Sequence, residues 1–360
     1  MAPDAVDLSR IRRALVVKLR HHGDVLLASP VFGALKSQWP DIAIDALVYD
    51  DTRDMLALHP AIRRVHTVGR NWRRLGPGRR IAAEWKLLRD LRAARYELLI
   101  HLTEHPRGAW LARTLGVLAS VAPRRDGAWW RTSFTHCYPT VGGGRRHTVE
   151  TNLDALRRIG MYPAPSERRL FLDPGEDAVV RMDGVLAQAG FERSGFIQVH
   201  PASRWRFKCW TEGSMAALID ALQNEGHRVV VTGSSDARER SFVDRVLALC
   251  RRAPVSLAGS TSLKDLAALT RRARMFIGVD SAPMHIAAAV GTPTIALFGP
   301  SGEIEWGPWL VPHLVVSSAQ HPCRPCGLDG CGGGKISDCL TSIEVQDVLR
   351  AVQRLHAMTV

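Results

Sequence analysis

The chain has 360 residues, of which 46% are hydrophobic and 23% charged, and its formal net charge is +13 at pH 7. This length exceeds one ordinary α/β domain and suits two domains of roughly 150 to 180 residues each. No apolar run approaches the roughly 20 residues that cross a bilayer, and the first residues lack the apolar stretch and cleavage site of a signal peptide. We therefore expect a two-domain cytoplasmic protein.

The excess of basic residues, 48 Lys and Arg against 35 Asp and Glu, favours a polyanionic partner. Nucleic acid, an anionic membrane surface and phosphorylated substrates would all satisfy it, and composition does not choose among them. Most of the basic residues are arginines, which suits bidentate phosphate recognition but would also follow from a GC-rich genome.

The first part of the chain alternates the patterns of buried strands with those of helices. Strands are predicted at residues 14–19, 42–49, 64–68 and 96–102, and helices at 25–39, 51–59 and 82–94. An Arg-rich loop precedes the last of these helices. Strands that alternate with helices predict parallel βαβ units in a doubly wound sheet.

Residues 130–167 interrupt this alternation. They contain three prolines and the run GGGRR at 142–146, so we place the interdomain connection there, with one helix at 148–159. The predicted domains are 1–167 and 168–340. Residues 341–360 contain a closing amphipathic helix, at 343–356, that could pack back on the first domain.

The alternation then restarts and predicts a second doubly wound sheet. Strands are predicted at 196–200, 227–233, 255–259, 275–280 and 294–299, with helices at 211–224, at 263–271 and in the segment that ends at residue 290. Neither a GxxxxGK[ST] loop nor a GxGxxG fingerprint occurs at the first strand of the chain, so nucleotide hydrolysis by a P-loop enzyme and ordinary NAD-dependent chemistry lose their main support. Ligands of such sheets bind beyond the carboxyl ends of the strands, and the loops after residues 19, 200, 233, 259 and 279 all contain polar or small residues suited to a ligand.

The most specific of these loops is GVDSAPMH, at residues 278–285. Asp280 ends a predicted strand, Ser281 can cap the following helix, and Pro283 suits its first turn. Backbone N–H groups at that helix start would face a phosphate. A purely structural interpretation also stays open, in which Asp280 and Ser281 only cap the helix and His285 is a satisfied interior histidine.

The second loop, HPASRWRFKCW at residues 200–210, offers the hydroxyl, guanidinium and ammonium donors that a diphosphate leaving group needs. Lys208 lies between aromatic residues, where its stem can pack while the ammonium reaches a ligand. The alternative is a solvated basic loop.

The third loop, KLRHHGD, follows the first strand of the other domain. Asp24 could act there as a general base, with phosphate or sugar groups held by Lys18, Arg20, His21 or His22. The alternative is that Asp24 only caps the next helix.

Four of the seven cysteines, Cys323, Cys326, Cys331 and Cys339, lie in a Gly/Pro-rich segment near the C-terminal end. The odd total argues against a disulfide framework in a cytosolic protein. The CxxC pair suggests structural zinc or another soft metal, but the second pair is spaced irregularly for a zinc ribbon, so free thiols are the alternative. We expect no catalytic metal site.

Together the three loops resemble the heptosyltransferases of glycosyltransferase family nine, which build the inner core of lipopolysaccharide. The resemblance is carried by KLRHHGDVLLASPVFGALK, HPASRWRFKCW, GVDSAPMHIAAAVGTPTIALFGP and the late segment that ends in GGGKISDCL. The opening and the DSAPMH motif are most similar to the heptosyltransferase III branch. One departure is Ser-Ala-Pro-Met, where other branches have Thr-Gly-Leu-Ser.

The resemblance implies a GT-B architecture, with two facing Rossmann-like domains and the active site in the cleft between them. It implies that the first domain binds the acceptor and that the second binds ADP-heptose. The implied donor-binding residues are Ser203, Lys208, Gly233, Asp280, Ser281, Ala282, Pro283, Met284 and His285. The further acceptor candidates are Lys18, Arg20, His21, His22, Arg63, Arg64, Arg70, Arg73 and Arg74.

The implied reaction is a single, inverting displacement in which Asp24 takes the proton of the acceptor hydroxyl and Lys208 holds the departing ADP. Because fixed cations and helix dipoles would hold the diphosphate, we expect no metal ion or other cofactor. A phosphorylated lipopolysaccharide core acceptor would place the protein at the inner face of the inner membrane, whose anionic surface would attract the +13 charge.

Other functions stay open at this point. The chain could use a different nucleotide sugar for capsule or O-antigen, or it could be a GT-B-like sugar-nucleotide epimerase. A nucleic-acid-binding protein is the remote alternative, motivated by charge alone. We expect no nucleic-acid partner, because the basic residues are dispersed and form no recognisable helix-turn-helix, zinc finger or aromatic RNA platform.

Overall fold

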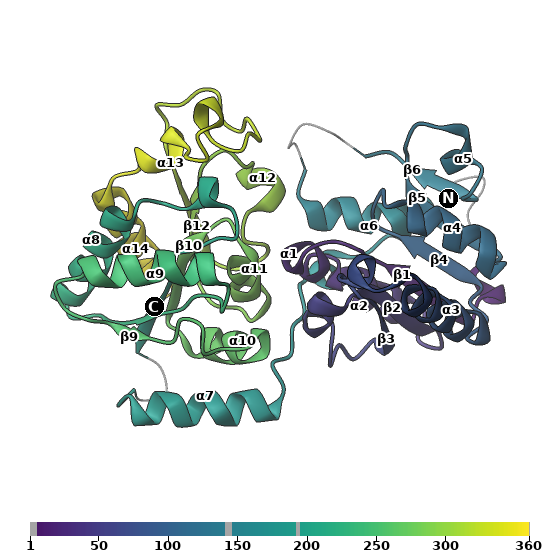
Figure 1. Ribbon diagram of the computed structural model, residues 1–360, viewed down its shortest axis with the longest axis horizontal. Helices are drawn as coiled ribbons and strands as arrows, with labels where there is room; N and C mark the ends of the chain where they lie inside the picture. The colour runs from purple at the N-terminus through teal and green to yellow at the C-terminus, as the bar shows by residue number, and fades with distance from the viewer. Residues whose placement is uncertain (1–5, 141–145, 192–194, 360) are drawn as a thin grey trace. The chain divides into compact units, whose positions relative to one another are not determined.

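Each half of the chain forms a parallel six-stranded sheet covered by helices (Figure 1). The structure is a computed structural model that describes residues 6–140, 146–191 and 195–359. The chain divides into two units, Met1–Leu172 and Asp173–Val360. The predicted boundary at residue 167 lies earlier, whereas Phe171 still belongs to the first unit because its N–H donates to Ser29 Oγ at 3.0 Å.

The strands of the first unit have the order β3-β2-β1-β4-β5-β6, and all neighbours are parallel. They are β1 (Arg13–Val17), β2 (Ala43–Tyr49), β3 (Ile62–Val68), β4 (Leu98–His101), β5 (Ala119–Pro123) and β6 (His136–Tyr138). The helices are α1 (His22–Leu26), α2 (Ser29–Gln38), α3 (Pro77–Ala93), α4 (Pro106–Leu115), α5 (Ala128–Arg131) and α6 (Thr148–Arg158). Short 3-10 turns are η1 (Leu8–Arg10), η2 (Asp50–Met55), η3 (Trp72–Arg74) and η4 (Pro165–Arg168).

The strands of the second unit have the order β12-β11-β10-β7-β8-β9, again all parallel. They are β7 (Phe196–His200), β8 (Arg228–Val231), β9 (Val255–Ser256), β10 (Met275–Val279), β11 (Thr294–Phe298) and β12 (His313–Ser317). The helices are α7 (Glu176–Gln188), α8 (Glu212–Asn224), α9 (Ala237–Leu249), α10 (Leu263–Arg272), α11 (Ala282–Ala289), α12 (Glu303–Trp306), α13 (Asp338–Thr341) and α14 (Val345–Thr359). The 3-10 turns are η5 (Arg206–Lys208) and η6 (Cys331–Gly333).

Both sheets have the strand order of a Rossmann fold, because each places its first and fourth strands side by side at the centre. The central strands β4, β7 and β10 are buried along their whole length, and β1 is buried after its first residue, which explains why they read as continuous apolar runs rather than as alternating patterns. The direction in which successive strands are added to the sheet reverses between β1 and β4 in one unit and between β7 and β10 in the other, and such a place is called a switch point. Ligands of such sheets bind at these two switch points. The predicted GT-B class is confirmed.

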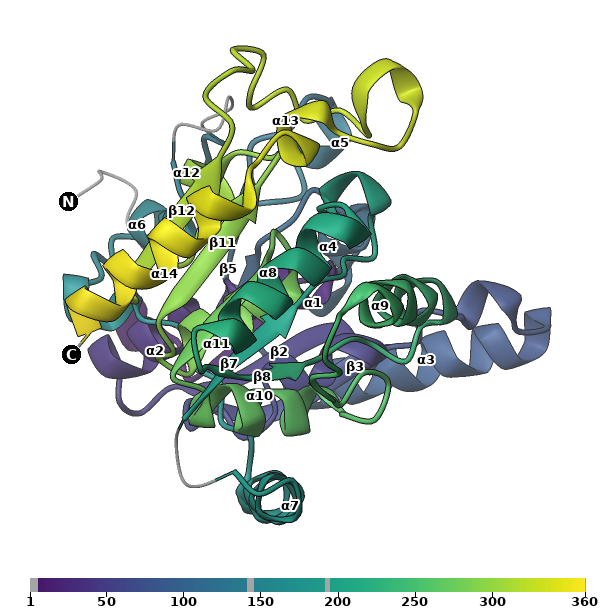
Figure 2. The same ribbon diagram turned by 90° about the vertical axis from the view of Figure 1, so that its left-hand side faces the viewer.

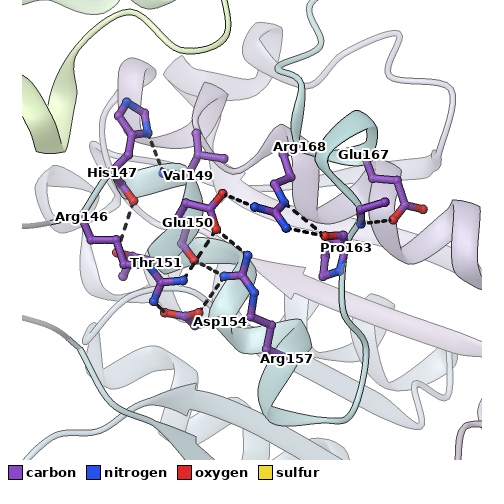
Figure 3. Close-up of polar contacts among 11 residues, drawn as sticks. Arg146, His147, Val149, Glu150, Thr151, Asp154, Arg157, Pro163, Glu167 and Arg168 are labelled. Carbon is purple, nitrogen blue, oxygen red and sulfur yellow. Dashed lines mark hydrogen bonds and ion pairs between the residues drawn. The ribbon is translucent and has the colours of Figure 1, made fainter.

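The prediction that residues 130–167 form the interdomain connection is wrong for most of that region. Residues 136–138 form β6, which pairs with β5, and α6 belongs to the first unit. An ion-pair cluster fixes the segment that follows α6 (Figure 3): Glu150 accepts hydrogen bonds from both Arg157 and Arg168, and Asp154 accepts one from Arg146. Of the GGGRR run, residues 142–145 lie outside the described residues.

The closing helix α14 packs within the second unit, against α8, β11 and β12. Its apolar face, which includes Val348, Val352 and Leu355, joins the core of that sheet. Trp210 Nε1 donates to the carbonyl of Ile343 just before the helix, at 3.2 Å. The apolar face of this helix, which the sequence suggested for packing on the first domain, is therefore buried within its own unit, where β12 is one of its partners. Among the described residues, no helix is long and apolar enough to span a bilayer.

Candidate active site

Two of the predicted donor loops meet at the switch point of the second sheet. Lys208, on η5 after β7, donates from Nζ to Asp280 Oδ2 at 2.5 Å, and Asp280 directly follows β10. Asp280 is buried, whereas Lys208 keeps part of its side chain in solvent. The sheet therefore brings a buried carboxylate and an accessible ammonium group together from positions 72 residues apart.

The loop that carries Lys208 is held on both sides. Ser337 Oγ donates to the carbonyl of Phe207 at 2.8 Å, and the N–H of Ser203 donates to Cys209 Sγ at 3.2 Å. Ser203 and Cys209 are both buried. The solvated basic loop considered from the sequence is therefore an ordered structure, and the ammonium group has a fixed anchor.

The start of α11 lies beside this ion pair. Ser281 is the N-cap residue with extended backbone, but its side chain makes no capping bond, and its Oγ instead donates to the carbonyl of Val279 at 3.2 Å. The expectation that the Ser281 side chain caps the helix is thus wrong. The backbone N–H groups of the first turn are consequently not satisfied by a serine cap, which leaves this helix start suited to an anion.

The remaining residues of the DSAPMH motif divide by burial. Ala282 and Pro283 are half-buried, whereas Met284 and His285 are buried. Met284 packs with Phe276 and Phe298 in the core beneath the helix. Its side chain therefore serves packing, which corrects its inclusion among donor-contacting side chains.

A polar network beneath the donor loops includes a residue that sequence reasoning missed. Thr232, at the end of β8, lies 2.9 Å from His200 Nδ1 and 3.1 Å from Gln198 Nε2. Burial lowers the pKa of His200 to about 4, so its ring is neutral at pH 7 and shares a hydrogen bond with the Thr232 hydroxyl through Nδ1. Next to it, a side chain on Gly233 would come within 3.0 Å of Val243, so close packing explains this glycine.

Glu305 is a second residue that the sequence did not single out. It lies on α12, which follows β11, and burial raises its pKa, with the negative charge of Asp280 adding to this effect. Two neighbouring carboxyl groups and one ammonium group thus share the switch point. The signal available in the sequence was the GEIEW segment directly after a predicted strand.

The candidate base lies at the switch point of the first sheet. Asp24 is in the first turn of α1, directly beyond β1, and its side chain is 16% exposed. Arg20 Nε lies 3.7 Å from Asp24 Oδ1. His21 occupies the N-cap position, so the alternative that Asp24 caps the helix is wrong. The Asp24 side chain is thus partly exposed at the carboxyl edge of the sheet and is accessible to a ligand there.

Lys18 is buried beneath this site and connects separate segments of the first unit through hydrogen bonds. Its buried Nζ donates to the carbonyl of Leu102 at 3.1 Å and to Asn152 Oδ1 at 2.9 Å, while Asn152 Nδ2 donates to the carbonyl of Leu27 at 2.9 Å. Burial lowers the pKa of Lys18 to about 8, against the opposing effect of Asp24. Lys18 is therefore an interior brace rather than an exposed acceptor ligand. Asn152 was missed, although a lone amide on the apolar face of α6 marks it.

Comparison with known proteins identifies the family. The model for glycosyltransferase family 9 (heptosyltransferase) matches residues 84–336. Lipopolysaccharide heptosyltransferase 3 of Escherichia coli K12 is 36% identical over 94% of this chain and 96% of its own length. The chain belongs to glycosyltransferase family 9. The resemblance drawn from the three loops, including its heptosyltransferase III branch, is confirmed.

Solved structures of this family share the fold. A family 9 glycosyltransferase from Veillonella parvula matches with a TM-score of 0.83 at 21% identity, over 99% of each chain. E. coli heptosyltransferase WaaC, solved with ADP, matches with a TM-score of 0.73 at 18% identity, over 95% of this chain and 99% of its own. At these identities the likeness concerns the arrangement of strands and helices.

The acceptor candidates on β3 and in the loop after it differ in what they contact. Arg70 donates from Nε to Asp51 Oδ2 at 2.7 Å and from Nη2 to the carbonyl of Arg20 at 3.0 Å, and His22 Nε2 lies 2.9 Å from the carbonyl of Asp51. These contacts place Arg70 and His22 beside the loop that carries Asp24. The remaining candidates divide between exposed residues, His21, Arg64 and Arg74, and Arg73, whose side chain lies outside the described structure.

Arg63 has a structural partner in this family 9 enzyme. It donates from Nε and Nη2 to the two oxygens of buried Asp45, at 3.0 and 2.7 Å, and Tyr96 Oη donates to Asp45 Oδ2 at 2.5 Å. His66 lies 3.5 Å from the same oxygen. Burial alone would raise the pKa of Asp45, but the hydrogen bonds from His66, Arg63 and Tyr96 outweigh it and hold the pKa well below its usual range. The prediction of Arg63 as an acceptor ligand is therefore corrected.

Replacing Asp45 with Asn is expected to lower the free energy of unfolding at pH 7 by about 2 to 3 kcal/mol, below the full cost of breaking a buried ion pair because Arg63 stays half-solvated. Because the folded-state pKa of Asp45 is depressed, its contribution is present above its ordinary pKa and disappears as the pH falls through the folded value. Urea unfolding at several pH values should show the gap to wild type closing on acidification. Exposed Asp41→Asn is the control, and a pH-independent gap would contradict the assignment.

The four late cysteines do not form the metal cluster considered from the sequence. All four are free thiols, with Cys323, Cys326 and Cys331 exposed and Cys339 buried. Among the described residues, no three His, Cys, Asp or Glu side chains lie close enough to hold a metal ion. Burial raises the pKa of Cys339, and the nearby thiols of Cys323, Cys326 and Cys331 add to this effect.

Proposed function

We propose that this enzyme transfers heptose from ADP-heptose to a sugar hydroxyl of the lipopolysaccharide inner core, with inversion and without a metal ion or other cofactor. The observation that carries the proposal is the Lys208–Asp280 pair beside the start of α11, in a chain whose relatives are named lipopolysaccharide heptosyltransferase 3. This arrangement suits a nucleoside diphosphate sugar because a cation, a carboxylate and free backbone N–H groups converge there.

In the donor half of the proposed mechanism, Lys208 and the first turn of α11 hold the diphosphate. Asp280 neutralises Lys208 in the free protein, at 2.5 Å, so donor binding would exchange one anionic partner for another. The released carboxylate of Asp280 can then accept hydrogen bonds from sugar hydroxyls. Since a fixed ammonium group and a helix dipole meet the charge that develops on ADP, the step needs no divalent ion.

In the acceptor half, Asp24 takes the proton of the attacking sugar hydroxyl. The oxygen forms a bond to the anomeric carbon of heptose as the bond to the ADP oxygen breaks, and one displacement inverts that carbon. Arg20 lies in the loop that carries Asp24, Arg70 donates to the Arg20 carbonyl, and both suit phosphate groups of the core acceptor. A lipid-linked acceptor also implies a peripheral position at the cytoplasmic face of the inner membrane, where the charge of +13 favours anionic lipid.

A thermal-shift panel of ADP-, GDP-, UDP- and dTDP-sugars tests the donor. A ligand that binds only the folded state at 100 times its Kd should stabilise the protein by about 2.7 kcal/mol, so ADP-heptose should raise the melting temperature and the other nucleotides should not. A response to another nucleotide alone would reject the heptose assignment.

Product analysis separates transferase from epimerase chemistry. A transferase releases ADP only when the core acceptor is present, whereas an epimerase converts the nucleotide sugar without one. Conversion of the donor in the absence of acceptor would overturn the proposed reaction.

A further inference from the structure

The first half of α3 lies on the surface with no buried residue. From residue 76 to residue 86 every side chain is exposed or intermediate, and the first buried position is Leu87. Figure 2 shows α3 extending past the strands of its own sheet. This part of the helix therefore lacks the apolar packing that normally holds a surface helix in place.

Two large apolar side chains lie on this unpacked half. Ile81 is 56% exposed and Trp85 is 63% exposed, and a spacing of four residues places them on one face of the helix. Leu75, just before the helix, is also exposed. Neighbouring exposed apolar residues on one helical face indicate an interaction surface rather than chance exposure.

The same half-helix carries an excess of positive charge. The nearby acidic residues are paired: Glu84 binds Arg107 through two hydrogen bonds of 2.6 Å, and Asp90 accepts from Lys86 at 2.9 Å. Within the described structure, the side chains of Arg79 and Arg80 make no hydrogen bond or ion pair. Two arginines next to Ile81 and Trp85 are therefore available to an anionic partner.

The position of the half-helix relates it to the candidate base. In a parallel sheet the helix after each strand begins at the carboxyl edge, so α3 after β3 starts at the same edge of the sheet as α1, which carries Asp24. Helix α5, after β5, begins there too and carries exposed Trp129 and Arg131, and exposed Arg124 lies in the loop before it. A second element at this edge thus repeats the combination of tryptophan and arginine.

We propose that the first half of α3 is the surface by which this enzyme docks on an anionic lipid bilayer. Ile81 and Trp85 enter the boundary between headgroups and acyl chains, and Arg79 and Arg80 contact lipid phosphates. Tryptophan and aliphatic side chains beside arginines are the composition of interfacial helices, and the aliphatic residues favour lipid over nucleic acid. The inference rests on the proposed function in one respect: a lipid-linked acceptor is the reason that a membrane would lie near Asp24.

Vesicle flotation of the full chain tests the surface directly. Wild type should bind phosphatidylethanolamine vesicles that contain phosphatidylglycerol, less so at high salt, and bind poorly without the anionic lipid. Ile81→Ser with Trp85→Ser, and separately Arg79→Glu with Arg80→Glu, should each lower binding roughly tenfold or more.

Two controls match these changes away from α3. Tyr162→Ser removes an aromatic side chain that is 60% exposed, and Arg251→Glu with Arg252→Glu reverses two exposed charges in the second unit. Both should bind vesicles as wild type does. Vesicle binding unchanged in the two α3 variants would overturn the proposal, as would wild-type binding to duplex DNA with none to vesicles.

A second readout separates docking from catalysis. Transfer to an acceptor dispersed in detergent should be the same in the α3 variants and in wild type, whereas transfer to the acceptor embedded in anionic vesicles should fall with binding. Loss of both activities together, with normal vesicle binding, would contradict the assigned surface. If wild type transfers no heptose at all, the proposed function is rejected. The flotation experiment would still test the docking surface independently.

Discussion

Replacing Asp24 with Asn is expected to lower kcat for heptose transfer by about 10²- to 10⁴-fold, with ADP binding unchanged. Asparagine has the same shape but cannot take the proton of the acceptor hydroxyl. Because His21 rather than Asp24 occupies the N-cap of α1, the substitution removes no helix cap, and the fold should be retained. The measurement is initial-rate kinetics with saturating donor, combined with thermal-shift titration of ADP.

Asp41→Asn provides the matched control, since Asp41 is an exposed aspartate at the opposite end of β2 from the carboxyl edge. Its kcat should equal that of wild type. An Asp24→Asn enzyme that keeps near-wild-type transfer would exclude Asp24 as the base. Loss of ADP binding along with transfer would instead indicate that the substitution disturbs the fold.

Replacing Lys208 with Met should lower kcat/KM for ADP-heptose by about 10²- to 10³-fold, because a neutral thioether cannot hold the charge that develops on ADP. The substitution also leaves Asp280 buried without its partner, which destabilises the protein. The activity loss alone therefore does not separate diphosphate binding from structural damage.

The double variant Lys208→Met with Asp280→Asn resolves this ambiguity. Removing both charges should restore much of the lost thermal stability, while donor affinity stays low because the diphosphate still lacks its cation. Lys208→Arg should keep the charge and recover part of the activity. Recovery of wild-type donor affinity in the double variant would show that Lys208 serves only to neutralise Asp280.

Much of the architecture was accessible from the sequence because the central strands are buried on both faces. Apolar runs such as residues 14–19 and 275–280 can be identified as strands without knowing which strands they pair with. The predicted helices between such runs show helical periodicity. The strands that were missed are β5, β6 and β12, and the longer helices that were missed are α4, α7 and α9. Strand β6 has three residues within a segment rich in Pro and Gly, and β12 is only partly buried, so neither produces a continuous apolar pattern.

The roles of individual polar residues depended on contacts between distant parts of the chain. Arg63 was interpreted as an acceptor ligand because it is basic, whereas the pairing of β2 with β3 places it against Asp45. Lys18 donates a hydrogen bond to Asn152, which lies 134 residues further along the chain. Strand register and helix docking decide such pairs, and neither is written in local spacing.

The sequence by itself determined the family, the two Rossmann-like sheets and the loops that carry Asp24, Lys208 and Asp280, since these follow from local patterns and from motifs in a fixed order. Only the tertiary structure decided which side chains in those loops stay accessible. In the folded protein Lys208 donates to Asp280, and Lys18 and Met284 are buried. Trp85 remains exposed on the first half of α3. The physical reason is that burial and charge pairing are set by what folds against a residue, and those neighbours come from far along the chain.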